Sequence, residues 1–138
     1  MSDARQGRVE AALEHAAERL GDITPLVMAE FFRRFPAAEA SFAHHAPHDP
    51  ARLGAEMVDN ALYCLMTWCE RRSEVEIILQ TSAPHHADTL HVPAEWYAGL
   101  LGAAADVLAR VARGGEEEAA LWAELSEELR AAVAASIA

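Results

Sequence analysis

The stretch Pro84-His85-His86-Ala87-Asp88-Thr89-Leu90-His91-Val92-Pro93 places three histidines just ahead of a strongly apolar segment. Adjacent histidines such as His85 and His86 can be solvated loop residues, a metal-binding pair, or one metal ligand beside a bystander. A histidine on a helix is more often a hydrogen-bonded surface residue than a ligand. The rest of the sequence is needed to decide between these alternatives.

The length and composition of the chain favour a single all-helical domain. The chain has 138 residues, of which 52% are hydrophobic. A chain of this size can bury about 70% of its unfolded surface, which is enough for a real core. Alanine, leucine and glutamate are abundant, and these residues favour helices over a β-sandwich. We therefore expect an all-α fold in one domain, over residues 1–138.

The charge of the chain bears on its partners and its location. The formal net charge is −11, from 22 acidic residues against 11 basic ones, and there is no lysine. Such a surface repels phosphate backbones and anionic lipids, so we expect no nucleic acid or membrane partner. Residues 1–5 lack the apolar core of a signal peptide, and no apolar run approaches the about 18 residues of a membrane span. We expect a cytoplasmic protein in which Cys64 and Cys69 are free thiols.

Apolar residues at helical spacing, together with turn signals, predict the main helices. Gly21-Asp22 should stop the first helix, Thr24 should cap the second, and Asp49-Pro50 has the form of a helix start. Pro84 should restrict where the histidine segment becomes helical, so that helix should be short. The other predicted helices cover about residues 5–20, 25–35, 50–70, 93–111 and 116–137.

Several motifs resemble globins in their order and spacing. They are the phrase Phe31-Phe32-Arg33-Arg34-Phe35-Pro36, Phe42 six residues after the proline, the histidine segment, Tyr97, and Ala120 to Leu125 around Trp122. No single piece is specific, but together they cover essentially the whole chain. The resemblance implies a globin fold of about six to eight helices that sandwich a haem.

The resemblance also implies a cofactor and the residues that hold it. The cofactor is haem b (iron protoporphyrin IX), and the residue at the proximal position, the iron ligand, is His86. In globins the phenylalanine at the Phe42 position stacks on the haem. Val92 and Tyr97 match positions that line the proximal side of the pocket, and Met28 matches the position that faces the gas ligand.

The other two histidines of the segment have weaker claims to the iron. His85 lies about 100° away from His86 around a helix, so both cannot face the same metal. His91 is expected near a haem propionate or in solvent. A neutral imidazole can bind haem iron through one nitrogen while a backbone carbonyl holds its other N–H, and His86 has the position to do so.

The distal side of the pocket is predicted to be apolar. The resemblance places Met57 where globins often carry histidine or glutamine, with Ala61 one turn further on. Another register would place Leu53 or Gly54 there, with Met57 or Val58 one turn later. Every register lacks a hydrogen-bond donor, and one such bond to polarised O2 is worth about 1–3 kcal/mol. CO and NO have little charge separation when bound, so their binding should lose less free energy from the missing hydrogen bond.

The resemblance implies a protein that reversibly binds a diatomic gas (O2, CO or NO), for gas binding, sensing or NO handling. Two alternatives remain. One is a six-coordinate redox protein with Met57 or a histidine of residues 44–48 as sixth ligand, and the other is a haemless regulatory module. An NO dioxygenase-type or pseudo-peroxidase side activity, a homodimer and a reductase partner also stay open. No nucleophile motif or carboxylate pair indicates another enzyme class.

Overall fold

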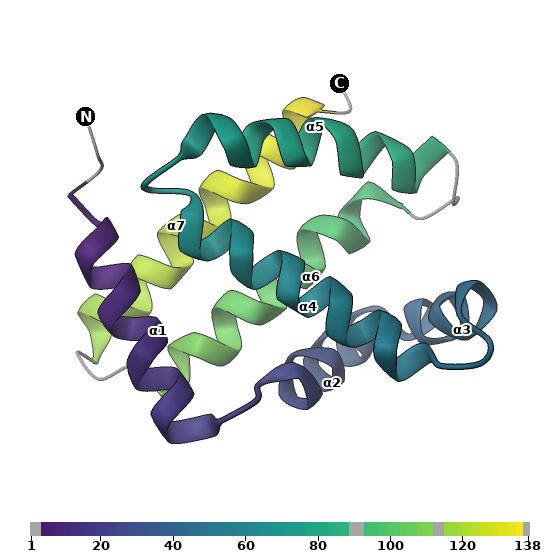
Figure 1. Ribbon diagram of the computed structural model, residues 1–138, viewed down its shortest axis with the longest axis horizontal. Helices are drawn as coiled ribbons and strands as arrows, with labels where there is room; N and C mark the ends of the chain where they lie inside the picture. Colours follow the sequence, from purple (N-terminus) through teal and green to yellow (C-terminus); the bar gives the residue numbers. More distant parts are fainter. Residues whose placement is uncertain (1–3, 89–92, 112–114, 137–138) are drawn as a thin grey trace.

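The computed structural model describes residues 4–88, 93–111 and 115–136, with side chains at all of these except residues 83 and 86–88. Within this part of the chain it contains seven α-helices and no strand (Figure 1), which confirms the expected all-α class. None of the described helices is long and apolar enough to cross a membrane. The helices are α1 (Gln6–Leu20), α2 (Thr24–Arg34), α3 (Pro36–His45), α4 (Pro50–Thr67), α5 (Arg72–Asp88), α6 (Ala94–Ala109) and α7 (Glu116–Ser136).

Local signals set most helix ends. Gly21 adopts a φ of +63°, which glycine tolerates without strain, and its N–H donates to the Ala17 carbonyl at the end of α1. Asp49 caps α4, because its carboxylate accepts a hydrogen bond of 3.0 Å from the Arg52 N–H. The predicted cap of α2 is wrong. Asp22 rather than Thr24 supplies the acceptor, from 3.0 Å, and Thr24 is already helical.

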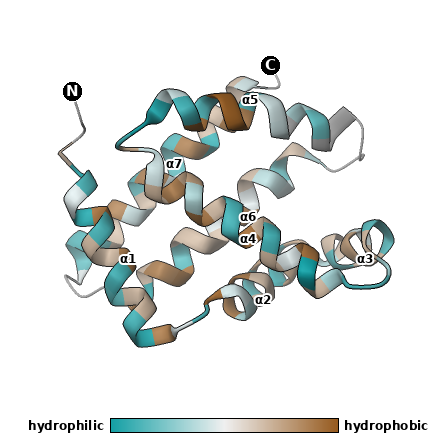
Figure 2. Ribbon diagram, in the orientation of Figure 1, coloured by the Kyte–Doolittle hydropathy of each residue, from teal (hydrophilic) through white to brown (hydrophobic). Residues whose placement is uncertain are grey.

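The prediction of a short histidine helix is also wrong, because α5 continues through Pro84. A proline inside a helix removes the hydrogen bond to the carbonyl four residues earlier, here that of Gln80. Gln80 is exposed, so its carbonyl can be solvated. The first half of α5 is held by Val75 and Leu79, both fully buried, and the middle of the helix is strongly hydrophobic in Figure 2. This burial outweighs the local preference for a break.

Helix α6 lies at the centre of the fold and packs against α1, α2, α4, α5 and α7. Its residues Leu100 and Leu108 are buried, and Trp122 of α7 packs into the same core. Gly99 allows α2 to come close, since a Cβ at this position would lie 2.3 Å from the ring of Phe35. A side chain there would displace the ring, so the glycine is required by packing rather than by φ.

Neither Cys64 nor Cys69 forms a disulfide, as predicted, and both are buried. Burial raises the pKa of the Cys64 thiol to about 11, because the charged thiolate is poorly solvated in the core. Cys64 therefore remains a neutral thiol near pH 7 and contributes to the core as a small apolar side chain.

The carboxylate of Glu30 links α2 to the end of α6. Glu30 is only 8% exposed and accepts hydrogen bonds from Arg33 (2.6 Å), Arg34 (2.9 Å) and Arg110 (3.0 Å). Arg34 also pairs with Asp106 of α6. The hydrogen bond from Arg33, together with the Arg34 guanidinium, lowers the pKa of Glu30 to about 2 although burial opposes the shift.

Replacing Glu30 by glutamine should lower the free energy of unfolding by about 2 kcal/mol at pH 7, because the arginines lose their carboxylate. The folded-state pKa of Glu30 lies below its unfolded value. The stabilisation is therefore complete above about pH 4.5 and disappears as the pH falls towards 2. Urea unfolding between pH 7 and pH 3 measures this, and the difference in stability between the two proteins should narrow as the pH falls towards 3.

The matched control is Glu127→Gln, which removes an exposed pair with Arg130 on α7. Exposed pairs contribute about 0–1 kcal/mol, so this variant should remain close to wild type at every pH. Equal losses in both variants at pH 7 would contradict a special role for Glu30.

Candidate functional site

An apolar cavity of about 480 Å³ lies between α2, α3 and the first turns of α4. Met28 and Phe32 of α2 and Phe42 of α3 form its apolar wall, and Glu39 is its charged lining residue among those described. Figure 1 places α3 and the C-terminal end of α5 on the same side of the molecule. The remaining lining residues are Thr24, Pro25, Ala43, Pro50, Ala51 and Gly54.

Aromatic packing holds Phe42 at this cavity. Its ring centroid lies 5.4 Å from that of Phe32 in an edge-on arrangement and 6.0 Å from that of Phe31. Phe31 is 2% exposed, whereas Phe42 is only half-buried. Edge-on and tilted aromatic pairs are favourable geometries, so the cluster orients the Phe42 ring while leaving part of it accessible.

Helix α4 presents a glycine to Met28. A Cβ added to Gly54 would lie 3.4 Å from the Met28 side chain, which is already close contact. Val58 and Ala61 follow on the same side of α4 at helical spacing, and both are buried in the core. Met57 is half-buried and packs against the same core from a neighbouring face of the helix.

Tyr97 of α6 lies in the core, where α6 meets α4. It is 6% exposed, and its hydroxyl accepts a hydrogen bond of 3.3 Å from the Asn60 amide. Burial raises the pKa of Tyr97, and hydrogen bonds with Ser82 and Asn60 oppose this shift. Asn60 carries no recognisable signal in the sequence, since only the crossing of α4 and α6 brings it to Tyr97.

Comparison of the chain with protein-family models, with curated proteins and with solved structures found no match. The geometry of the described residues is therefore the basis for interpreting the site. It brings Met28 and Phe42 to one cavity, whereas Met57, Val58, Ala61 and Tyr97 belong to the core and do not line that cavity.

The histidine segment is described only in part. His85 is exposed on α5, and His86 lies within the same helix, although its side chain is outside the described set. His91 and Val92 also lie outside the described residues. Among the side chains that the structure describes, no three of His, Cys, Asp or Glu form a group that could hold a metal ion. A haem needs only one protein ligand, so this observation does not bear on His86.

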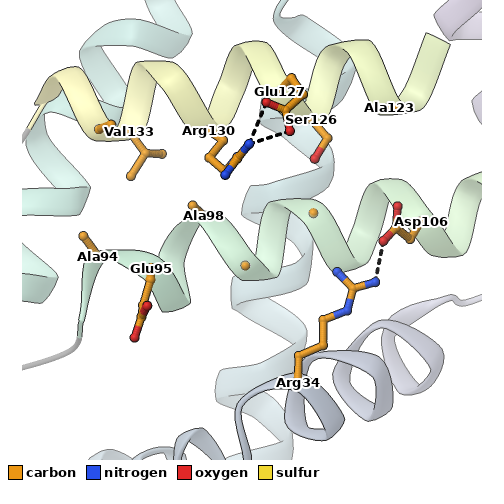
Figure 3. A pocket seen from close by; sticks show the side chains of 13 residues that line it. Arg34, Ala94, Glu95, Ala98, Asp106, Ala123, Ser126, Glu127, Arg130 and Val133 are labelled. Carbon is orange, nitrogen blue, oxygen red and sulfur yellow. Dashed lines mark hydrogen bonds and ion pairs between the residues drawn. The ribbon is translucent and has the colours of Figure 1, made fainter. Parts of the chain in front are cut away.

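Figure 3 shows a second groove, of about 610 Å³, between α6, α7 and the end of α2. Four of its five charged lining residues form two pairs, Arg34 with Asp106 and Arg130 with Glu127 at 2.6 Å, and the fifth is Glu95. The floor includes small residues such as Ala98. Among the described residues, those predicted for the functional site do not line this groove.

Proposed function

We propose that this chain is a globin-type haem protein in which His86 ligates the iron and a diatomic gas is the ligand. The resemblance of the sequence to globins motivates the proposal. The structural observation that supports it best is that Met28 and Phe42, on different helices, line one apolar cavity. The resemblance assigns Met28 to contact with the gas and Phe42 to packing against the haem, both in a single pocket.

The apolar character of the cavity suits a haem, whereas its described lining comes from α2, α3 and the start of α4 and includes no residue of α5, the helix that carries His86. A cavity of 480 Å³ falls within the range of about 300–1,000 Å³ that small-molecule and cofactor sites occupy. Its apolar and aromatic wall suits a flat macrocycle, with the half-buried ring of Phe42 packing against one face. His86 would hold the iron through one imidazole nitrogen. When bound, the haem supplies an iron with an open position for a gas.

The orientation of α4 favours one of the two registers considered for the distal side. Gly54 faces Met28, so Leu53 and Met57, one turn apart and both half-buried, lie on the next face of the helix. Among the described residues, α4 lines the cavity with Pro50, Ala51 and Gly54 but not with Leu53 or Met57, so the register favoured is the one with Gly54 at the gas and Val58 one turn later. Asn60 lies further along α4, and its amide donates to Tyr97. The side chains nearest the gas therefore remain apolar in this proposal.

Absorption spectra of the purified protein, oxidised and then reduced, test the proposal directly. A Soret band is expected, with reduced visible bands of five-coordinate iron. A protein without a Soret band after haem addition would support the haemless regulatory module. Six-coordinate reduced bands without added gas would support the redox protein, and variants of Met57, His44 and His45 would then identify the sixth ligand.

The distal side makes a further prediction. Without a hydrogen-bond donor, the wild-type protein should release O2 quickly, or its iron should be oxidised quickly by O2. It should still bind CO well. Met28→Tyr should slow O2 release by up to about 100-fold, because each 1.4 kcal/mol of added hydrogen bonding is worth about tenfold in rate. Stopped-flow measurement of O2 and CO release compares the variant with wild type.

Met28→Phe is the matched control, since it adds the same ring without a hydroxyl. Slow O2 release in both variants would assign the effect to ring bulk rather than to hydrogen bonding. Slow release by wild-type protein would mean that a donor already reaches the gas, with His44 and His45 as the residues to test, since Tyr63 lies in a different groove and its hydroxyl donates to Glu74.

A further inference from the structure

A third depression lies between α1 and α4, away from the cavity at α2 and α3. It has a volume of about 450 Å³, and its floor is apolar. Met66, at its α4 side, is 41% exposed, which makes it one of the few large apolar side chains so open to solvent among the described residues. The floor is formed chiefly by Leu13, Ala16, Ile23, Leu62 and Leu108. We call this depression the α1–α4 groove.

The rim of the α1–α4 groove is acidic on both sides. Of the described residues, the charged ones that line it are Asp22 and Asp59. Glu10 and Glu14 lie about 60° and 100° around α1 from Leu13, on its solvent side, as helical spacing requires. On α4, Glu56 lies about 60° around the helix from Asp59. Glu10, Glu14 and Glu56 are all exposed.

Nearby arginines offset part of this rim. Arg19 and Arg8 lie about 60° and 80° around α1 from Ala16, and Arg52 pairs with Glu56 at 3.4 Å. Arg71 pairs with Glu74 at 3.2 Å beyond the end of α4. The two charged residues that line the groove itself, Asp22 and Asp59, are both acidic, so the groove combines an apolar floor with negative charge in a chain whose net charge is −11.

The dimensions of the groove suit two turns of a helix. The α1 wall runs from Leu13 to Gly21, which spans about 12 Å at about 1.5 Å per residue. An amphipathic helix would place apolar side chains at i, i+3 or i+4, and i+7 on the floor, with its polar residues along the rim. Met66 is adaptable enough to pack against such side chains.

We propose that the α1–α4 groove docks an amphipathic helical segment of a partner protein whose polar face carries lysine or arginine. Basic residues on that face would meet the rim carboxylates, whereas a second copy of this chain or an anionic lipid surface would bring like charge to it. The site is separate from the proposed gas site and does not depend on bound haem.

The test uses the full chain and a fluorescent amphipathic peptide of about 18 residues, with leucines on one face and lysines on the other. Fluorescence anisotropy should show saturable binding that weakens with salt. Asp59→Arg should weaken binding about tenfold, and Met66→Ala should weaken it severalfold. A peptide of the same composition in scrambled order should bind much more weakly.

Two control variants separate the groove from the overall charge and from exposed apolar surface in general. Glu117→Arg makes the same charge change on exposed α7, and Ile77→Ala truncates an apolar side chain that is 62% exposed on α5. Both should bind the peptide like wild type, and circular dichroism should show all four variants folded. Equal binding of the two peptides, or equal losses in test and control variants, would overturn the proposal.

Two further measurements exclude the other occupants. Sedimentation of the chain alone would overturn the proposal if it showed a dimer that Met66→Ala dissociates, because the groove would then hold a second copy. Binding to vesicles of anionic phospholipid that Met66→Ala abolishes would overturn it in favour of a membrane. Monomeric protein that ignores such vesicles and binds the peptide at this groove is the expected result.

Discussion

Replacing His86 by alanine should abolish tight haem retention, whereas His85→Ala should leave it nearly unchanged. The two residues are adjacent in α5, so their side chains point about 100° apart and only one can face the iron. His85 is exposed to solvent. The sequence resemblance assigns the iron to His86, and loss of the one protein ligand removes the bond that anchors the cofactor.

Transfer of haem to an excess of apomyoglobin measures retention in the wild type and both variants. Added imidazole should partly restore the absorption spectrum of His86→Ala, because it replaces the missing ligand without the helix. Two variants that lose haem at the same rate would contradict the assignment. Retention by His86→Ala together with loss by His85→Ala would move the ligand one residue along the chain.

Phe42→Ala should lower the combined stability of the fold and of haem binding by about 3–5 kcal/mol, the usual cost of removing a packed phenylalanine. The Phe42 ring has two roles in this proposal. One edge packs against Phe31 and Phe32, and the accessible part would lie against the haem. Haem loss to the same acceptor should therefore accelerate, and thermal unfolding of the haem-bound protein should occur at lower temperature.

Phe35→Ala is the matched control, because Phe35 contacts Phe31 in the same aromatic cluster but does not line the cavity. It should reduce stability towards urea without a comparable acceleration of haem loss. An unchanged rate of haem loss in Phe42→Ala would place Phe42 outside the haem site, even if the fold were destabilised.

Short-range features of the sequence predicted much of the helix pattern. Gly21, Asp49-Pro50 and the glutamates from Glu116 mark helix ends in the sequence and in the structure. These signals are readable because capping and left-handed turns depend on side chains within a few residues of the helix end. The all-α class followed from composition and apolar spacing for the same reason: both act within a turn or two of the chain.

Features that depend on two distant segments were not readable in this way. The break expected at Pro84 does not occur, because burial of Val75 and Leu79 against other helices outweighs the lost hydrogen bond. The Asn60 contact with Tyr97 was likewise missed, since it requires α4 and α6 to cross. Apolar periodicity identifies which face of a helix is buried but not which neighbour buries it.

The sequence by itself determined the helical class, most helix ends and the absence of a disulfide between the two cysteines, because these depend on local propensity, capping and spacing. Only the tertiary structure decided that Gly54 faces Met28, which turns Leu53 and Met57 to the adjacent face of α4. It also decided that Glu30 gathers arginines from two helices around a buried carboxylate. The physical reason is that side-chain partners across helices depend on how whole helices pack, and packing is set by the shape of the complete core.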